Sequence, residues 1–309
     1  MITSVFKKST PLNYSLVVIL ILVFFFMFQI KDPSWVTSYF LAFQKVSLLC
    51  FIVASFFMIN FVVKKNGLSK DNGYAILFYL LFILFFPTLF NNTNVIYANF
   101  FILLALRRLI SLQSLKASKE KIFDASFWIF VASLFQFWSI LFIILVFISI
   151  VFHVSRDYRN WVLPFVALLA VAILFYMTTL IFNIDIVSFF QERASIDFRI
   201  NYFKNNAENA ALSIYTAVAL FFVTSMLMTI SNRPQIVHSS YKKIVAYFFI
   251  AVFVFIISPD KSNDLLLFSI APLAIMATAH VEYMQQKLNN EIVYYTLIVC
   301  SLILFFSQL

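Results

Sequence analysis

The chain has 309 residues, of which 63% are hydrophobic and only 11% are charged. A soluble domain averages roughly 25% charged residues, and a soluble fold of this length could not bury so much apolar surface, so composition excludes the soluble classes. The net charge of +9 does not indicate a nucleic-acid partner, because the excess lies in short basic loops beside apolar runs, where cations set orientation and contact the lipid bilayer.

A membrane-spanning helix needs about 20 apolar residues. The sequence predicts an all-α, polytopic membrane protein, and no repeat or linker divides it, so residues 1–309 form one integral domain. The predicted spans, in chain order, are 12–30, 43–63, 74–90, 94–110, 161–182, 208–230, 244–258, 265–280 and 292–307. Prolines inside three of these spans are expected to kink them: Pro87, Pro164 and Pro272.

One apolar stretch, residues 123–154, is too long for a single straight span. Both of its flanks are basic, with Lys121 before it and Arg156 after it. The chain should therefore cross and return, with a turn around Gln136 to Ser139. This hairpin brings the expected total to about 11 helices, within a range of 9–12, and a single span over 123–154 stays the alternative.

The distribution of charge predicts the orientation. Of the 22 lysines and arginines, sixteen fall on one side of the predicted spans and six on the other. Cytoplasmic loops carry the excess of positive charge. The sequence thus predicts a bacterial inner-membrane protein with a cytoplasmic N-terminus and a periplasmic C-terminus. The first apolar run has no small-residue cleavage site after it, so we expect an uncleaved span.

Two of the outer connections are long enough to hold chemistry, Lys31–Gln44 and Asn183–Ala207. In the second, apolar residues recur at helical spacing over 186–198 while polar residues face elsewhere. This pattern predicts a short amphipathic helix in the outer interface.

Several classes of site find no support in the sequence. No predicted span carries an ionisable residue near its middle, and the two glycines, Gly67 and Gly73, share one loop. Both features argue against a secondary active transporter. His153, His238 and His280 fall near the cytoplasmic boundary without other ligands at metal spacing, so we expect interface-facing imidazoles and no metal site. No nucleotide-binding or soluble-hydrolase motif is present.

The remaining chemistry lies in acids and cations of the outer face. A carboxylate at a membrane surface can act as general base toward a sugar hydroxyl, while a nearby cation holds the departing phosphate. Asp32 is the candidate base and Arg193 and Arg199 are the candidate phosphate ligands, with Lys204 and Lys261 as alternatives. Asp260 and Asp264 complete the candidate substrate-binding set. For each of these residues, a solvated loop charge is the competing interpretation.

Two stretches resemble the GT-C superfamily of membrane glycosyltransferases, which use polyprenyl-phosphate sugars. The first is Asn99-Phe-Phe-Ile-Leu-Leu-Ala-Leu-Arg-Arg108 with the hairpin that follows it. The second is Ser262-Asn-Asp-Leu-Leu-Leu-Phe-Ser-Ile-Ala-Pro-Leu-Ala-Ile275. In that family a catalytic aspartate sits in the first outer loop, and Asp32 is the matching acid. The opening Met1–Pro11 resembles an uncharacterised membrane family of Bacteroidota.

Three functions are therefore open. The first is a GT-C-like glycosyltransferase that handles a lipid-linked sugar at the periplasmic face, with a polyprenyl-phosphate sugar as donor. The second is a non-enzymatic membrane scaffold or assembly factor of an envelope complex, which would dock a membrane-protein partner through the basic loop Arg107–Lys121. The third is a passive or facilitated carrier.

Overall fold

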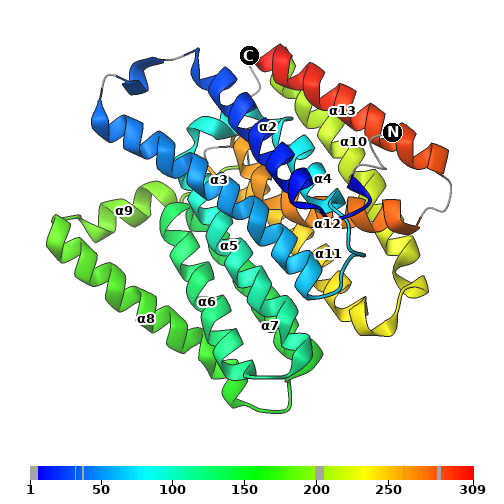
Figure 1. The fold of residues 1–309 in the computed structure, drawn as a ribbon. Coiled ribbons are helices and arrows are strands. Elements are labelled where there is room, and N and C mark those ends of the chain that lie inside the picture. Colours follow the sequence, from blue (N-terminus) through cyan, green and yellow to red (C-terminus); the bar gives the residue numbers. More distant parts are fainter. Residues whose placement is uncertain (1–5, 32, 37, 199–204, 260, 284–286) are drawn as a thin grey trace.

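Helices account for all of the regular secondary structure that the computed structural model describes, and no strand occurs in that part (Figure 1). The described residues are 6–309, apart from 32, 37, 199–204, 260 and 284–286. In a hydrocarbon environment every backbone N–H and C=O must be paired within the protein, which long apolar helices achieve without help from water.

The helices follow one another with short connections. In chain order they are α2 (Pro11–Gln29), α3 (Tyr39–Lys65), α4 (Tyr74–Ile83), α5 (Thr93–Ser111), α6 (Ser118–Phe135), α7 (Ile143–His153), α8 (Arg159–Phe182), α9 (Ile186–Arg193), α10 (Asn206–Thr229), α11 (Gln235–Ile257), α12 (Leu267–Tyr283) and α13 (Lys287–Gln308). Short 3-10 segments join several of them, among them η2 (Pro87–Asn91), η3 (Leu112–Ser114), η4 (Phe137–Phe142) and η6 (Asn263–Leu266).

The predicted all-α membrane architecture agrees with this structure. Among the described residues, eight helices are long and apolar enough to cross a membrane, and two shorter apolar helices accompany them, Tyr74–Ile83 and Phe137–His153. Each predicted apolar segment contains a helix. The hairpin is confirmed as two helices, because α6 ends at Phe135, Gln136 is extended, and η4 and α7 lead back.

Two predicted spans differ in the structure. Residues 74–90 do not form one helix: α4 ends at Ile83, and Pro87 begins the separate segment η2. A proline disfavours helical backbone in the residue before it and lacks the N–H that the next turn needs. The helix predicted at 244–258 begins nine residues earlier, at Gln235 directly after Pro234. By contrast, Pro164 and Pro272 are both accommodated inside helices.

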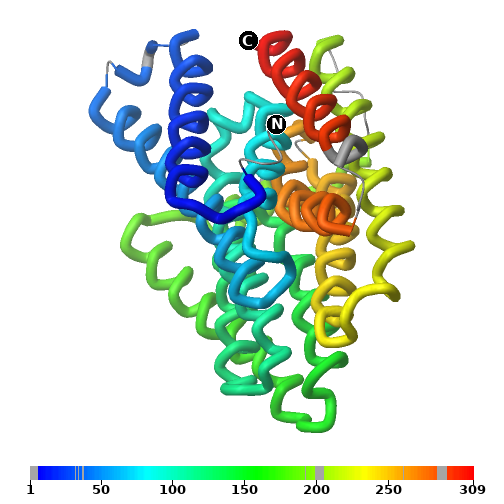
Figure 2. Tube along the Cα trace, turned by 45° about the vertical axis from the view of Figure 1, so that its right-hand side comes forward, coloured from blue at the N-terminus to red at the C-terminus, as the bar shows by residue number. Residues whose placement is uncertain are grey.

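The helices surround α12, which lies at the centre of the molecule in Figure 2. Its apolar 18-residue stretch is entirely buried, and the helix packs against α4, α10 and α11. At the margin, α8 packs mainly on α6, and only 17% of its apolar 18-residue stretch is buried within the protein. Lipid is the natural neighbour of its exposed apolar residues.

The helix bundle has two ends that differ in their polar contacts. The basic end is the one at which α3 and α5 finish and α6 begins. There Lys121 of α6 donates hydrogen bonds to Ser111, the last residue of α5, and to Ser114 in η3. The opposite end is where α6 finishes and α9 lies, shown by the hydrogen bond from Arg193 to the Leu134 carbonyl.

Candidate functional site

A large hollow with a polar lining opens at the basic end, between the last turns of α3 and α5 and the first turn of α6. Its volume is about 530 Å³, which falls within the usual range for ligand pockets, about 300–1,000 Å³. We name it the basic hollow, and its lining is Phe61, Lys65, Asn66, Arg107, Arg108, Ser111, Gln113, Ser114, Lys116 and Lys121.

An aromatic ring positions two of the cations in the basic hollow. The Lys65 ammonium lies 5.0 Å from the Phe61 ring centroid, and the Arg107 guanidinium carbon lies 4.5 Å from the same centroid. A cation within about 6 Å of a ring face is attracted by the ring quadrupole. Phe61 therefore holds both charges at the wall of the hollow, although a phenyl ring carries no negative charge that would neutralise them.

Two further cations of the hollow are engaged by neighbouring groups. The Arg108 guanidinium forms an ion pair with Asp124 at 2.8 Å. The Lys121 Nζ donates to the Ser111 carbonyl and to the Ser114 hydroxyl, at 2.7 Å each. Burial lowers the pKa of Lys121, and the nearby charges of Arg108, Lys65 and Lys116 lower it further. These like charges repel each other, and an added anion would relieve the repulsion.

The remaining cations lack an acidic counterpart in the part of the chain that the structure describes. Neither Lys65, Arg107 nor Lys116 belongs to any of its ion pairs. Lys116 is exposed on a loop whose neighbours Leu115 and Ala117 have left-handed backbones, with φ of 55° and 48°. Such backbones cost free energy in residues other than glycine and often occur at functional sites. The basic hollow is thus suited chemically to binding an anion.

Arg193, a predicted phosphate ligand, contacts two groups of the protein itself. Its guanidinium donates to the Leu134 carbonyl at 2.8 Å and lies 4.0 Å from the Phe189 ring centroid. Leu134 belongs to the last turn of α6, whose carbonyls have no partner within the helix. Arg193 therefore fastens α9 to the end of α6.

Asp264 is buried in η6 at the entrance to α12. Its carboxylate accepts hydrogen bonds from the Thr88 hydroxyl and, at 3.1 Å, from the Asn92 amide. It joins η2 and the start of α5 to η6. Arg193 and Asp264 each have other partners, and no ion pair joins them among the described residues.

Three predicted site residues, Asp32, Arg199 and Asp260, lie outside the described residues, as does Lys204. Of the alternatives, Lys261 is buried and donates to the Asp197 carbonyl. The predicted interfacial helix over 186–198 is helical from Ile186 to Arg193. The predicted roles of the candidate site residues thus stay predictions.

The histidines correct one expectation. His280 does not face the interface: it is buried on α12, where the Ser225 hydroxyl contacts its Nδ1 at 2.5 Å and the Phe221 ring lies 5.0 Å away. The residues of α12 from Leu267 to Val281 are all buried, so this part of the helix does not face a membrane surface. Within the described residues, no group of three or more His, Cys, Asp or Glu side chains could hold a metal ion.

Sequence reasoning missed Lys243. The earlier start of α11 places this residue inside the helix, where it is fully buried. Its Nζ donates to the Leu109 carbonyl at 2.6 Å and lies 3.2 Å from His153 Nε2. The pair Lys242-Lys243 beside an apolar run was the available signal, but it could not show that only the second lysine turns inward.

Comparisons with known proteins give a family without an assigned activity. No curated protein and no solved structure matched the chain. One family model does match, over residues 4–309, and its description is "Family of unknown function (DUF6427)". Because the match covers nearly the whole chain, we conclude that the protein belongs to the DUF6427 family.

Proposed function

We propose that the protein is a non-enzymatic membrane scaffold or assembly factor of an envelope complex, and that the basic hollow docks an acidic segment of a partner protein. In this proposal the protein lies in the bacterial inner membrane, with the basic end and the N-terminus in the cytoplasm and the C-terminus in the periplasm. The excess of cations in the loops at that end supports the orientation.

One observation carries the proposal: a hollow of about 530 Å³ in which Lys65, Arg107 and Lys116 lack an acidic counterpart among the described residues. Uncompensated like charges destabilise the free protein, and an acidic partner relieves this repulsion on binding. The hollow is wide enough for several side chains, and its serines, Asn66 and Gln113 keep its wall polar while bonding within the protein. A short acidic segment matches both its size and its charge.

The first experiment measures the binding of a fluorescent deca-glutamate peptide to the purified full chain in nanodiscs of neutral lipid. We expect binding that weakens as salt is added, because screening reduces the attraction between exposed charges. The triple variant Lys65→Gln, Arg107→Gln, Lys116→Gln should raise the Kd about tenfold, since each exposed charge contact contributes about 0.2–1 kcal/mol.

A matched variant controls for net charge. Lys70→Gln, Arg156→Gln and Lys242→Gln remove the same charge from positions that do not line the basic hollow, and this variant should keep most of the affinity. An equal loss in both variants would show non-specific attraction and overturn the proposal. Purification in mild detergent adds a second readout, in which a stoichiometric protein partner supports the scaffold and a copurified polyprenyl lipid favours an enzyme.

The GT-C-like glycosyltransferase is the second candidate, supported by the observation that a helix, α9, forms within the segment where an interfacial helix was predicted. Its mechanism would rest on Asp32 as base, Arg199 as phosphate ligand and Asp260 near the substrate, because Arg193 and Asp264 are engaged in contacts between helices. A polyprenyl-phosphate sugar would be the donor.

The variant Asp32→Asn tests this candidate in cells. Loss of a glycan phenotype at unchanged expression would support the enzyme, because the amide cannot accept the proton of an attacking hydroxyl. A fully active Asp32→Asn protein would exclude this mechanism. This outcome does not affect the peptide-binding experiment, because Asp32 and the basic hollow are predicted to lie on opposite sides of the membrane.

A further inference from the structure

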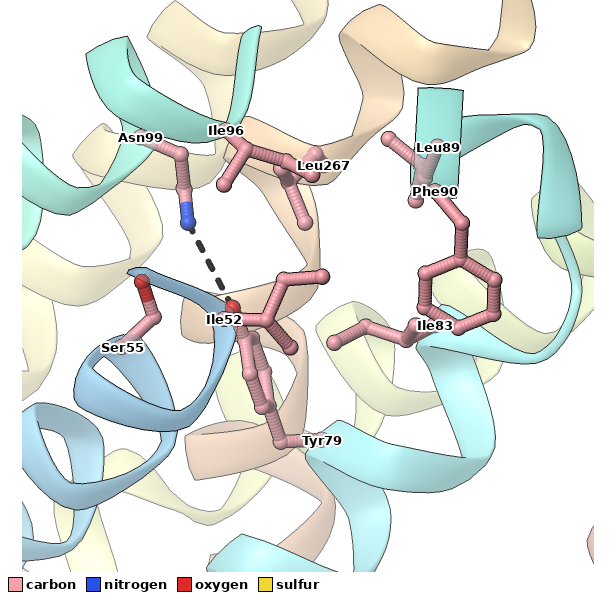
Figure 3. Close-up of a pocket in the computed structure, with 9 residues that line it drawn as sticks. All are labelled: Ile52, Ser55, Tyr79, Ile83, Leu89, Phe90, Ile96, Asn99 and Leu267. Atoms are coloured by element: carbon pink, nitrogen blue, oxygen red, sulfur yellow. Dashed lines mark hydrogen bonds between the residues drawn. The ribbon is translucent and has the colours of Figure 1, made fainter. Parts of the chain in front are cut away.

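A small cavity lies inside the bundle where α3, α4 and α5 meet (Figure 3). Three polar side chains, one from each of these helices, line it: Ser55, Tyr79 and Asn99. All three are about 1% exposed. The rest of the lining is apolar and consists of Ile52, Ile83, Leu89, Phe90, Ile96 and Leu267.

The polar atoms around this cavity are incompletely paired. The Asn99 amide donates to the Tyr79 hydroxyl at 3.4 Å, as the dashed line in Figure 3 shows, which is long for a hydrogen bond of this type. The Asn99 Oδ1 is buried without a partner. Leaving such an acceptor unpaired away from water costs about 1–3 kcal/mol, and the hydrocarbon environment offers no substitute.

The donors and acceptors left over match one water molecule. The Tyr79 hydroxyl accepts from Asn99, and the Ser55 hydroxyl is its other polar neighbour but forms no hydrogen bond of ordinary length with it, so the Tyr79 hydrogen can go to a water between them. The Ser55 hydroxyl gives its hydrogen to the Phe51 carbonyl at 2.8 Å and keeps its lone pairs. A water that accepts from Tyr79 and donates to Asn99 Oδ1 and to Ser55 would make three hydrogen bonds, the usual number for a buried water.

The cavity also has the right size. Its volume for a water-sized probe is about 10 Å³, close to the least that holds one water, about 10–15 Å³, and too small for a larger ligand. We propose that this cavity is a binding site for a single ordered water that links α3, α4 and α5 near the middle of the membrane. Ser55 lies close to the midpoint of α3, so bulk water does not reach the site.

Radiolytic footprinting in water labelled with oxygen-18 tests the proposal on the full chain in nanodiscs. Radicals formed from a bound water oxidise the side chains next to it, so Tyr79 should incorporate the label although it is buried. Tyr215 is the matched control: it is equally buried, and its hydroxyl is already paired with Ser269 at 2.7 Å. We expect Tyr79 to be oxidised at least several times faster than Tyr215. Equal protection of the two tyrosines would overturn the proposal.

Two variants test the water site further, the first by oxidation of Tyr79 and the second by thermal stability. Asn99→Leu removes the acceptor and fills the cavity, so oxidation of Tyr79 should fall to the level of Tyr215. Ser55→Ala removes the hydrogen bond to the Phe51 carbonyl and also an acceptor for the water, so its Tm should fall by about 2 °C or more below that of Ser126→Ala, which loses only the carbonyl bond. Ser126 is a matched control, because it is buried on α6 and donates to the Ile122 carbonyl at the same 2.8 Å. Identical Tm values for the two serine variants would contradict the water site.

Discussion

Ala117 shows how a single backbone conformation can be tested. Its φ of 48° lies in the left-handed region, which costs an L-residue about 1–2 kcal/mol. Glycine adopts this conformation without strain but loses about 0.5–1 kcal/mol more conformational entropy on folding. Ala117→Gly should therefore stabilise the protein by up to about 1 kcal/mol, which a thermal melt in detergent can measure.

Ala125 gives the contrast for that prediction. It lies on α6 with ordinary helical backbone and is fully buried. Ala125→Gly should destabilise the protein, because glycine in a helix interior costs about 0.5–1 kcal/mol. Destabilisation by both substitutions would show that the loop after α5 is not strained in solution.

Asp185 provides a prediction about pH. Its carboxylate accepts hydrogen bonds from the N–H groups of Val187 and Ser188 and caps α9. These backbone bonds, that of Ser188 first, lower the pKa of Asp185 below its ordinary value of 3.8. The cap is fully present above pH 3.8 and is lost as the pH falls through the lowered pKa of the folded state.

We expect the amides of Val187 and Ser188 to lose protection as the pH falls from 5 to 2.5, measured by hydrogen exchange with correction for the intrinsic rate. Asp185→Asn is the control, because asparagine also caps helices but does not titrate, so its protection should not change over this range. A similar loss in Asp185→Asn would show that another group controls the end of α9.

At the scale of the elements, Lys243 joins three helices. It projects from α11 to the Leu109 carbonyl in the last turn of α5 and to His153 at the end of α7. Helix C-termini carry partial negative charge, so the ends of α5 and α7 both favour an ammonium group at this position. This arrangement allows a buried lysine that has no carboxylate partner among the described residues.

Two substitutions separate the packing of Lys243 from its charge. Lys243→Ala leaves a cavity and removes the contact with α5, so it should lower the free energy of unfolding by about 2–4 kcal/mol. Lys243→Met keeps most of the volume and needs no buried charge, so its cost should be about 1 kcal/mol or less. Denaturation in mixed micelles compares the two variants, and an equally large loss in both would assign the stabilisation to the ammonium group.

At the scale of the whole molecule, the orientation in the membrane is open to direct measurement. In a background without Cys50 and Cys300, we expect Lys116→Cys to react with an impermeant maleimide only after the inner membrane is opened. Asp185→Cys should react in intact spheroplasts, because both residues are exposed but belong to opposite ends of the bundle. The reverse labelling pattern would place the basic hollow in the periplasm and remove the proposed docking function.

Much of this architecture follows from local sequence. Apolar runs of span length, only two glycines and prolines near helix ends indicate the helices, because in lipid a backbone has few other ways to pair its polar groups. The hairpin was predictable from its basic flanks, and α9 from its apolar periodicity. The break of the helix at Pro87 was harder to predict, because Pro164 and Pro272 are tolerated within helices. Sequence alone does not show which of these three prolines ends a helix.

The sequence by itself determined the class of the protein, the places of its helices and the concentration of cations in the loops at one end, because these depend on residues close together in the chain. Only the tertiary structure decided that Phe61 fixes Lys65 and Arg107, that Lys243 turns inward, and that Ser55, Tyr79 and Asn99 share one cavity. Such contacts join helices separated in sequence, and the rotation of each helix about its axis is set by packing against its neighbours.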